Sequence, residues 1–348
     1  NAAHNMILTH ATAFQSYITK VQTNQCGGAP RLCTKGDAGT EPYLAAHNMI
    51  LAHANAVHSY KTKFQLNQGG KIGITNVSHF FEPLNDTDDD RNAVIRALDW
   101  MFGWFTAPVT TGDYPPNMRK TVGNRLPKFS PNERRLVMGS YDFIGVNYYT
   151  TWYATLSPKE PGQPDTYLTD RGVTTSYEKD GVPIGEPTGA AWLYIVPRGL
   201  YNLLVYAKET YKINLIYITE NGCADLLNHD LTVSQAKEDP VRVRYYLEHL
   251  WYLLKAIRLG GVNVKRYFLW SLGDNFEWAD GYTYRFGTFY IDFVNGQLTR
   301  TPKTSAIWWR NFFTKTPPIN GPEKRDAAAE SEIDSRKRTR SNSNKACG

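Results

Sequence analysis

The sequence predicts an α/β fold with a parallel sheet, and two observations carry this prediction. Four short apolar stretches each end in polar or aromatic residues, which is typical of buried strands that run into a loop. Longer segments between these stretches repeat apolar residues at helical spacing. Strands that alternate with helices form βαβ units, in which the strands lie parallel to one another.

The predicted elements follow in a regular order along the chain. We expect buried strands at residues 71–81, 140–150, 213–222 and 264–272. We expect helices at residues 90–105, 200–212 and 239–260, and the last of these ends at the glycine pair Gly260-Gly261. The four strands are half the number that a closed (β/α)8 barrel requires.

An internal repeat precedes the first predicted strand. Residues 2–22 return as residues 45–65 with 15 of 21 positions identical, and each copy predicts an amphipathic helix. Two copies are too few for a solenoid, so a local duplication, or an artefact of the transcript or its assembly, accounts for the repeat. We divide the chain into a duplicated helix (1–25), one α/β domain (26–316) and a disordered tail (317–348).

The composition excludes several classes of protein. A chain of 348 residues with 41% hydrophobic residues can bury a substantial core. A net charge of +6 is modest for this length and does not indicate a nucleic-acid partner. The sequence contains no run of 18 apolar residues, so we expect no membrane-spanning helix.

Four cysteines are present, at positions 26, 33, 223 and 347. They form no CxxC pair and no histidine stands at ligand spacing, so we expect no metal site. Cys26 and Cys33 flank a polar, glycine-rich loop that a disulfide would close. Such a bridge is more typical of a secretory compartment than of the cytosol or nucleus.

One predicted strand ends in a carboxylate. In LIYITENGC, Leu215 to Cys223, the residues are apolar up to Thr219, and Glu220 is followed by the turn pair Asn221-Gly222. A carboxylate at the carboxyl end of a parallel strand is typical of catalysis. A surface carboxylate in a turn is the alternative interpretation.

Four motifs together resemble a known family. They are GITNVSHFFEPLND, DFIGVNYYT, YITENG and WSLGDNFEWADGYTYRFG. In this order they are similar to the retaining β-glucosidases of glycoside hydrolase family 1, in the plant form that includes alkaloid glucosidases. The resemblance implies a (β/α)8 barrel, no cofactor, and hydrolysis of the O-glycosyl bond of a β-D-glucoside, the expected small-molecule partner.

The resemblance also assigns roles to individual residues. It makes Glu220 the nucleophile, and gives Tyr149 a hydroxyl that hydrogen-bonds this nucleophile. It places Asn147 beside the reacting sugar. Asn147 and Tyr149 are two apart on one strand and therefore point the same way. For Tyr149, packing in the core at the strand end is the alternative.

The tryptophan-rich motif supplies the implied glucose subsite. By resemblance, Trp270 stacks on the sugar face, Glu277 accepts hydrogen bonds from sugar hydroxyls and Trp278 donates its indole N–H. Trp192 resembles a position near the aglycone entrance, and a tryptophan packed before a helix is the alternative. The sequence also departs from the family pattern, for example at Gly273, where a bulky apolar residue is usual.

The second carboxylate of the family is not found in the sequence. The family's acid/base is the Glu of a TFNEP segment on the fourth strand, and the chain contains no NEP; its EP pairs are Glu41-Pro42 and Glu82-Pro83. We therefore expect a barrel truncated to about strands five to eight. One hypothesis is a β-glucosidase of which this sequence is a part, inactive as this chain alone. The other is a pseudo-glucosidase with a regulatory role, which associates with itself or with a full-length homologue.

The tail predicts a cellular location. Lys324-Arg325 and the run 336–340 form two basic clusters around a flexible spacer, the arrangement of a bipartite import signal. We expect a nuclear protein that binds an import carrier. The alternative is the secretory pathway or vacuole, reached through a leader outside the given sequence. The Cys26–Cys33 loop and the sequon at Asn85 favour this alternative.

Overall fold

The main sheet contains four parallel strands in the order β1-β3-β10-β12. The computed structural model describes residues 36–226, 228, 230–293 and 297–314. The strands are β1 (Gly73–Val77), β3 (Phe143–Asn147), β10 (Ile216–Glu220) and β12 (Val264–Tyr267). Helical segments separate each strand from the next, so the α/β prediction is confirmed.

The register of the main sheet aligns the carboxyl ends of its strands. Val77 pairs with Asn147, and Asn147 in turn pairs with Glu220. An irregularity between Ile218 and Glu220 shifts the end of β10 relative to β3. As a result, the side chains at and beyond these strand ends can face a common space.

All four predicted strands are shorter than expected, and the first predicted range also contains the start of a strand of another sheet. Residues 71–81 contain β1 and the start of β2 (Phe80–Pro83), which leaves the main sheet to pair with β4 (Thr151–Leu156). Similarly, β3 ends at Asn147, and the strand predicted at 264–272 ends at Tyr267. Apolar and aromatic residues continue past these points, and the sequence pattern does not show where strand geometry ends. Tyr148 beyond β3 is buried, whereas Phe268 and Leu272 beyond β12 are exposed.

The remaining strands form small sheets. β5 (Val173–Ser176) joins β4 antiparallel, and together with β2 they form a three-stranded sheet. The two-stranded pairs are β6 (Glu178–Lys179) with β7 (Val182–Pro183), β8 (Glu186–Pro187) with β9 (Tyr194–Ile195), β11 (Asp225–Leu226) with β13 (Tyr284–Arg285), and β14 (Phe289–Ile291) with β15 (Arg300–Pro302).

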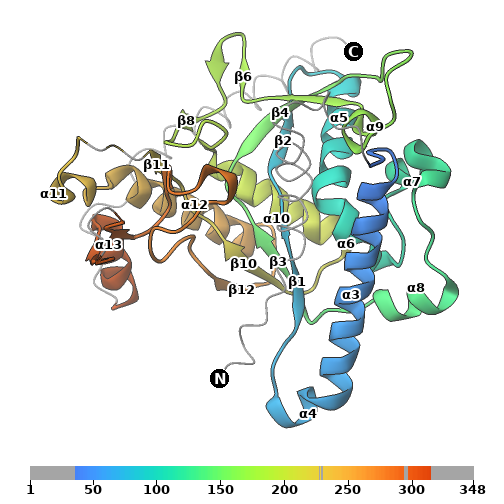
Figure 1. Ribbon diagram of the computed structural model, residues 1–348, viewed down its shortest axis with the longest axis horizontal. Helices are drawn as coiled ribbons and strands as arrows, with labels where there is room; N and C mark the ends of the chain where they lie inside the picture. Colours follow the sequence, from blue (N-terminus) through green and yellow to red (C-terminus); the bar gives the residue numbers. More distant parts are fainter. Residues whose placement is uncertain (1–35, 227, 229, 294–296, 315–348) are drawn as a thin grey trace, which may run out of the picture.

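The helices surround the main sheet. α3 and α8 lie at one end of the molecule and α11 and α13 at the other (Figure 1). The α-helices are α3 (Glu41–Lys63), α4 (Gln65–Gln68), α5 (Asp88–Leu98), α6 (Trp104–Thr111), α7 (Pro116–Val122), α8 (Pro131–Val137), α9 (Tyr167–Arg171), α10 (Pro197–Tyr211), α11 (Val233–Ala236), α12 (Pro240–Arg258) and α13 (Thr304–Phe313). Short 3-10 helices span Gly123–Arg125 and Trp278–Asp280.

The predicted helices are found with adjusted limits. The helix predicted at 90–105 is α5 and α6 joined by a π-helical turn, Asp99–Gly103. The second copy of the repeat falls on α3 and α4, and the first copy lies outside the described residues. The largest core cluster joins strand residues such as Ile144 and Ile216 to Leu203 of α10 and Ile50 of α3. Burial of such apolar side chains is the main source of stability.

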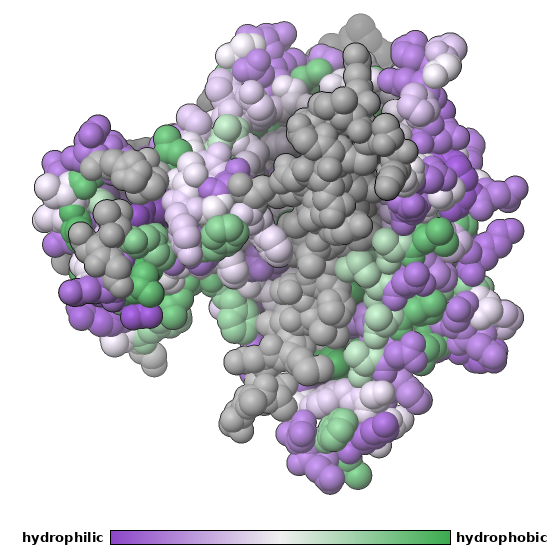
Figure 2. Space-filling model, in the orientation of Figure 1, coloured by the Kyte–Doolittle hydropathy of each residue, from purple (hydrophilic) through white to green (hydrophobic). Residues whose placement is uncertain are grey.

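On the face seen in Figure 2, hydrophobic residues form separate groups among hydrophilic ones. Of the helices that the structure describes, none combines the length and apolar character needed to cross a membrane.

Candidate active site

A cavity of about 550 Å³ opens at the carboxyl ends of the main-sheet strands. Residues at or just beyond the ends of all four strands line it: Val77, Tyr149, Glu220 and Trp270. Six tryptophan side chains contribute to its wall. A concave, largely apolar site with a few converging polar groups is the usual form of a small-molecule site.

Glu220 and Tyr149 meet inside this cavity. The Tyr149 hydroxyl donates a hydrogen bond to Glu220 Oε2 at 2.6 Å. Burial raises the pKa of Glu220 to about 7 and the charge of Glu277 adds to this rise, whereas hydrogen bonds from Tyr149 and Asn147 oppose it. Burial and the neighbouring Glu220 hold the pKa of Tyr149 well above its ordinary value, so the tyrosine keeps its proton.

The residues predicted to bind glucose lie on the same cavity. Trp270 donates its indole N–H to Glu277 Oε1 at 3.2 Å, and both side chains line the cavity. Glu277 is 8% exposed, whereas Trp278 is 49% exposed and forms part of the rim. The cavity thus brings the Glu220 and Glu277 carboxylates together with the predicted tryptophans, and these groups can bind hydroxyl groups and the apolar face of a sugar.

Asn147 and Trp192 occupy different positions relative to the cavity. Asn147 is fully buried and accepts a hydrogen bond from the Thr219 hydroxyl at 2.6 Å; it is not among the side chains that line the cavity. Its side chain hydrogen-bonds Glu220, and this bond lowers the pKa of that carboxyl group. Trp192 lines the cavity, and its ring meets the Tyr149 ring edge-on at 5.8 Å.

Several residues that line the cavity were not predicted from the sequence. His79, Trp152 and Arg171 line the cavity, and they come from the loop after β1, from β4 and from the end of α9. His79 lies inside the strand predicted at 71–81, and its place in the loop after β1 became visible only because β1 ends at Val77. Arg171 lies in a segment without apolar periodicity, so its position depends on long-range packing.

Buried polar contacts hold the segment that follows Glu220. The Asn221 amide donates to the Tyr148 carbonyl at 2.8 Å and accepts from the Tyr267 hydroxyl at 2.7 Å. Arg242, fully buried, donates to Asp225, to Asp239 and to the carbonyl of Cys223. These bonds fix the backbone next to the carboxylate.

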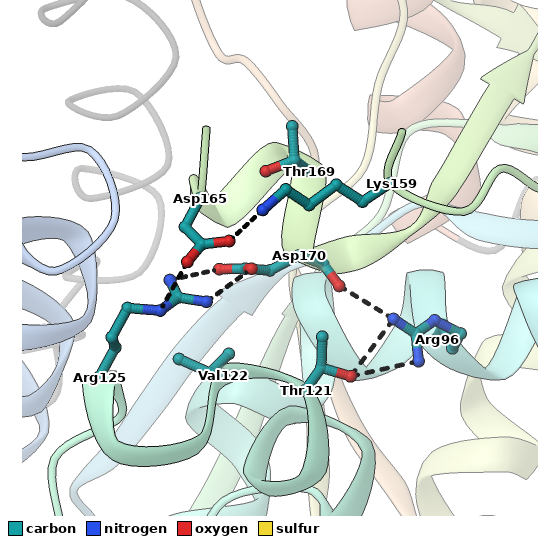
Figure 3. A pocket seen from close by; sticks show the side chains of 8 residues that line it. All are labelled: Arg96, Thr121, Val122, Arg125, Lys159, Asp165, Thr169 and Asp170. Carbon is teal, nitrogen blue, oxygen red and sulfur yellow. Dashed lines mark hydrogen bonds and ion pairs between the residues drawn. The ribbon is translucent and has the colours of Figure 1, made fainter. Parts of the chain in front are cut away.

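A second cavity, of about 400 Å³, lies beside α7 and α9 and is lined by charged groups that pair with one another (Figure 3). Arg125 forms an ion pair with Asp170 at 2.7 Å, and Asp165 pairs with Lys159. Arg96 donates to the Asp170 backbone carbonyl at 2.9 Å. Since Arg125 and Lys159 are paired with the two aspartates and Arg96 is bound to the backbone of α9, the network serves to hold α9 in place.

The remaining site predictions concern cysteines and metals. Cys26 and Cys33 lie outside the described residues, and Cys223 is buried as a free thiol. Within the described ranges, no group of three or more acidic, histidine or cysteine side chains could hold a metal ion.

Comparisons with known proteins agree on one family. The model of glycosyl hydrolase family 1 matches residues 27–317. The chain is 51% identical to oleuropein beta-glucosidase of Olea europaea over 292 residues, which cover 83% of this chain and 53% of that protein. It is 46% identical to raucaffricine-O-beta-D-glucosidase of Rauvolfia serpentina over 287 residues, which cover 82% of this chain and 53% of that protein.

Solved structures give the same result. The chain superimposes on the rice Os3BGlu6 beta-glucosidase with a TM-score of 0.78 and 42% identity, covering 80% of this chain and 58% of that one. A beta-glucosidase from Trichoderma harzianum gives a TM-score of 0.75 and 39% identity, covering 82% and 60%. The chain spans about half the length of the curated relatives it matches. With a family model that matches most of its length, the chain belongs to glycosyl hydrolase family 1.

Proposed function

We propose that this chain carries the nucleophile half of a retaining β-glucosidase and binds a β-D-glucoside in the 550 Å³ cavity. The observation that carries the proposal is the hydrogen bond from Tyr149 to Glu220, formed where Trp270 and Glu277 also converge. In a retaining mechanism, the ionised Glu220 attacks the anomeric carbon while the aglycone oxygen leaves. The relatives named above suggest a plant specialised metabolite as the substrate.

We propose further that the main sheet corresponds to strands five to eight of the family barrel. Its four parallel strands in chain order support this correspondence. The acid/base carboxylate would then belong to the fourth strand, and no NEP motif occurs in the sequence. General-acid assistance contributes about 10²–10⁴-fold, so we expect this chain alone to hydrolyse unactivated glucosides negligibly.

An activated mechanism-based label tests both proposals, that Glu220 is the nucleophile and that the chain lacks the acid/base carboxylate. A dinitrophenyl 2-fluoro-β-glucoside needs no acid, because its leaving group departs as a stable phenolate. We expect a new bond between Glu220 and the anomeric carbon, seen by intact-mass and peptide mass spectrometry and lost in Glu220→Gln. An alkyl β-glucoside should remain unhydrolysed. Its hydrolysis at a rate comparable to the dinitrophenyl compound would show that an acid/base is present after all.

A regulatory pseudo-glucosidase is the second candidate. Among the described strands, β1 pairs with β3 alone and β12 with β10 alone, so each leaves one edge open to association. The open edge of β12 carries exposed Lys265 and Arg266, which oppose unspecific strand pairing. Light scattering, alone and with a full-length family member, distinguishes a monomer from a complex; stable association without labelling of Glu220 favours this candidate.

Nuclear import stays a proposal based on the basic tail. Lys324, Arg325 and the run 336–340 lie outside the described residues. A fluorescent protein fused upstream of the full chain, compared with a chain ending at Pro317, tests it. We expect nuclear signal from the full chain alone, and equal distribution of the two fusions contradicts import.

A further inference from the structure

The cavity extends beyond the sugar-binding carboxylates to a second end. We call this the α9 end and define it by His79, Trp152, Tyr167, Arg171 and Thr175, all of which line the cavity. The His79 ring stacks on Trp152, with centroids 4.8 Å apart and planes 26° apart. A flat, partly aromatic surface of this kind suits an apolar or aromatic group.

Trp192 connects the α9 end to the nucleophile. Its ring meets His79 edge-on at a centroid distance of 6.0 Å, and it meets Tyr149 edge-on at 5.8 Å. Tyr149 in turn holds Glu220. A glucoside with its sugar at Glu220 would therefore reach the α9 end with the group attached to the anomeric oxygen.

Arg171 gives the α9 end an uncompensated positive charge. Among the described residues that line the cavity, it is the sole lysine or arginine. Its Nη2 donates to the Val173 carbonyl at 3.0 Å, while its Nε has no hydrogen-bond partner and no carboxylate of the described chain forms an ion pair with it. Burial lowers the pKa of Arg171, the penalty expected for a cation away from water.

The backbone that carries Arg171 is held in place from outside the cavity. Arg96 donates to the carbonyls of Asp170 and Arg171 at 2.9 and 2.8 Å. The Asp170 carboxylate accepts from Arg125, as Figure 3 shows, and also from the Tyr43 hydroxyl. A fixed backbone presents the guanidinium in one position, which favours a specific contact.

His79 adds a second polar group beside this cation. Its Nδ1 is buried without a hydrogen-bond partner among the described residues. Burial, together with the charge of Arg171, lowers the pKa of His79 to about 4, so at neutral pH the ring is uncharged. A neutral imidazole carries one N–H that can donate to an anion.

We propose that the α9 end binds an anionic group, namely a carboxylate on the aglycone of the glucoside. This inference rests on the proposed function, because it names the part of the substrate beyond the sugar. Arg171 would supply a charge-assisted hydrogen bond, and the stacked rings would hold the apolar body of the aglycone.

The test compares two glucosides that differ in one charge. The binding of 4-carboxyphenyl β-D-glucoside and of its primary amide is measured by tryptophan fluorescence on the whole chain at pH 7. A charge-assisted contact predicts tighter binding of the carboxylate by about tenfold to a hundredfold. Arg171→Gln should abolish this preference, because the carboxylate loses its charged partner. Continued binding of the amide shows that the variant is folded. Arg258→Gln, at an exposed position on α12, should retain the preference.

Other outcomes are equally decisive. Equal affinities in the native chain, or a preference that survives Arg171→Gln, would overturn the proposal. If Arg171→Gln does not fold, Arg171→Lys replaces it, and a reduced preference is expected because lysine keeps the charge but not the planar fork. If neither glucoside binds, the sugar site fails, and free 4-hydroxybenzoate against its amide decides the anion site by the same criterion.

Discussion

The Tyr149 hydroxyl lies 2.6 Å from Glu220 Oε2, although the two residues are 71 positions apart in the sequence. The tyrosine follows β3 and the glutamate ends β10, which are neighbours in the main sheet. Parallel pairing of these strands therefore brings together the donor and the carboxylate that it orients. The bond has two measurable consequences, one for reactivity and one for pH dependence.

Tyr149→Phe should slow labelling of Glu220 by the dinitrophenyl 2-fluoro-glucoside by about tenfold to a hundredfold, since a hydrogen bond to a charged group contributes about 1.5–3 kcal/mol. The expected cause is loss of orientation and of stabilisation of the carboxylate. Tyr177→Phe, a change at an exposed tyrosine, should label at the native rate. Equal labelling rates in the native chain, Tyr149→Phe and Tyr177→Phe would exclude a role for the hydrogen bond from Tyr149 to Glu220.

The pH dependence of labelling should report the ionisation of Glu220. The carboxylate is the nucleophile, and its pKa is raised to about 7, so the labelling rate should increase with pH and reach half of its maximum near pH 7. In Tyr149→Phe the midpoint should move to higher pH. The hydrogen bond from Tyr149 lowers the pKa of Glu220 in the native chain, and the variant lacks this bond. A midpoint near pH 4.5, the ordinary value for this group, would contradict the buried environment.

The same raised pKa affects stability. Between the ordinary pKa of 4.5 and the folded value of about 7, the folded chain binds more protons at Glu220 than the unfolded chain does. The contribution of this group to the free energy of unfolding therefore decreases as pH rises through that window. The free energy of unfolding, measured with urea, should depend on pH less steeply in Glu220→Gln than in the native chain between pH 5 and 7.

The sequence predicted the strands and the carboxylate because both depend on local pattern. The end of β10 was visible as an apolar run broken at Glu220, and parallel strands open their carboxyl ends to one edge. The glycine of FIGV, by contrast, has a non-local reason: a Cβ at Gly145 would lie 2.3 Å from Thr75 Oγ1 on the neighbouring strand, so close strand packing requires glycine there.

The α9 end was not predictable from local pattern. It depends on β2 and β4 leaving the main sheet to form a second sheet, and on Arg96 and Arg125 holding α9. These contacts join residues 45 to 75 positions apart. Nothing in the periodicity of the segment around Arg171 signals them.

Arg242→Met should lower the free energy of unfolding by about 3–5 kcal/mol, because it leaves the buried carboxylate of Asp239 without its counter-charge. Arg242 is fully buried and pairs with Asp239 at 2.5 Å and with Asp225 at 2.6 Å. Arg258→Met, at the exposed end of α12, should change the free energy by less than about 0.5 kcal/mol. Urea denaturation followed by tryptophan fluorescence measures both, and similar values for the two variants would contradict a structural role for the buried pair.

Gly222→Ala should impair both folding and glucoside binding. A Cβ at Gly222 would lie 1.8 Å from the Trp270 carbonyl oxygen, and Trp270 is also held by its backbone bond to the Asn221 carbonyl at 2.9 Å. The backbone of Trp270 must therefore move, and its indole carries the hydrogen bond to Glu277. We expect a loss of about 1–3 kcal/mol in the free energy of unfolding and weaker binding of an aryl β-glucoside.

Gly273→Ala provides the matched control for this effect. Its nearest neighbour would be the flexible Ile291 Cδ1 at 3.3 Å, which can shift by a few tenths of an ångström. Alanine also lowers the conformational entropy of the unfolded chain, so the change in stability should stay below about 1 kcal/mol. Urea unfolding and fluorescence titration of both variants separate the two cases. If Gly222→Ala binds the glucoside as tightly as Gly273→Ala does, close packing of Gly222 against Trp270 does not position the sugar site.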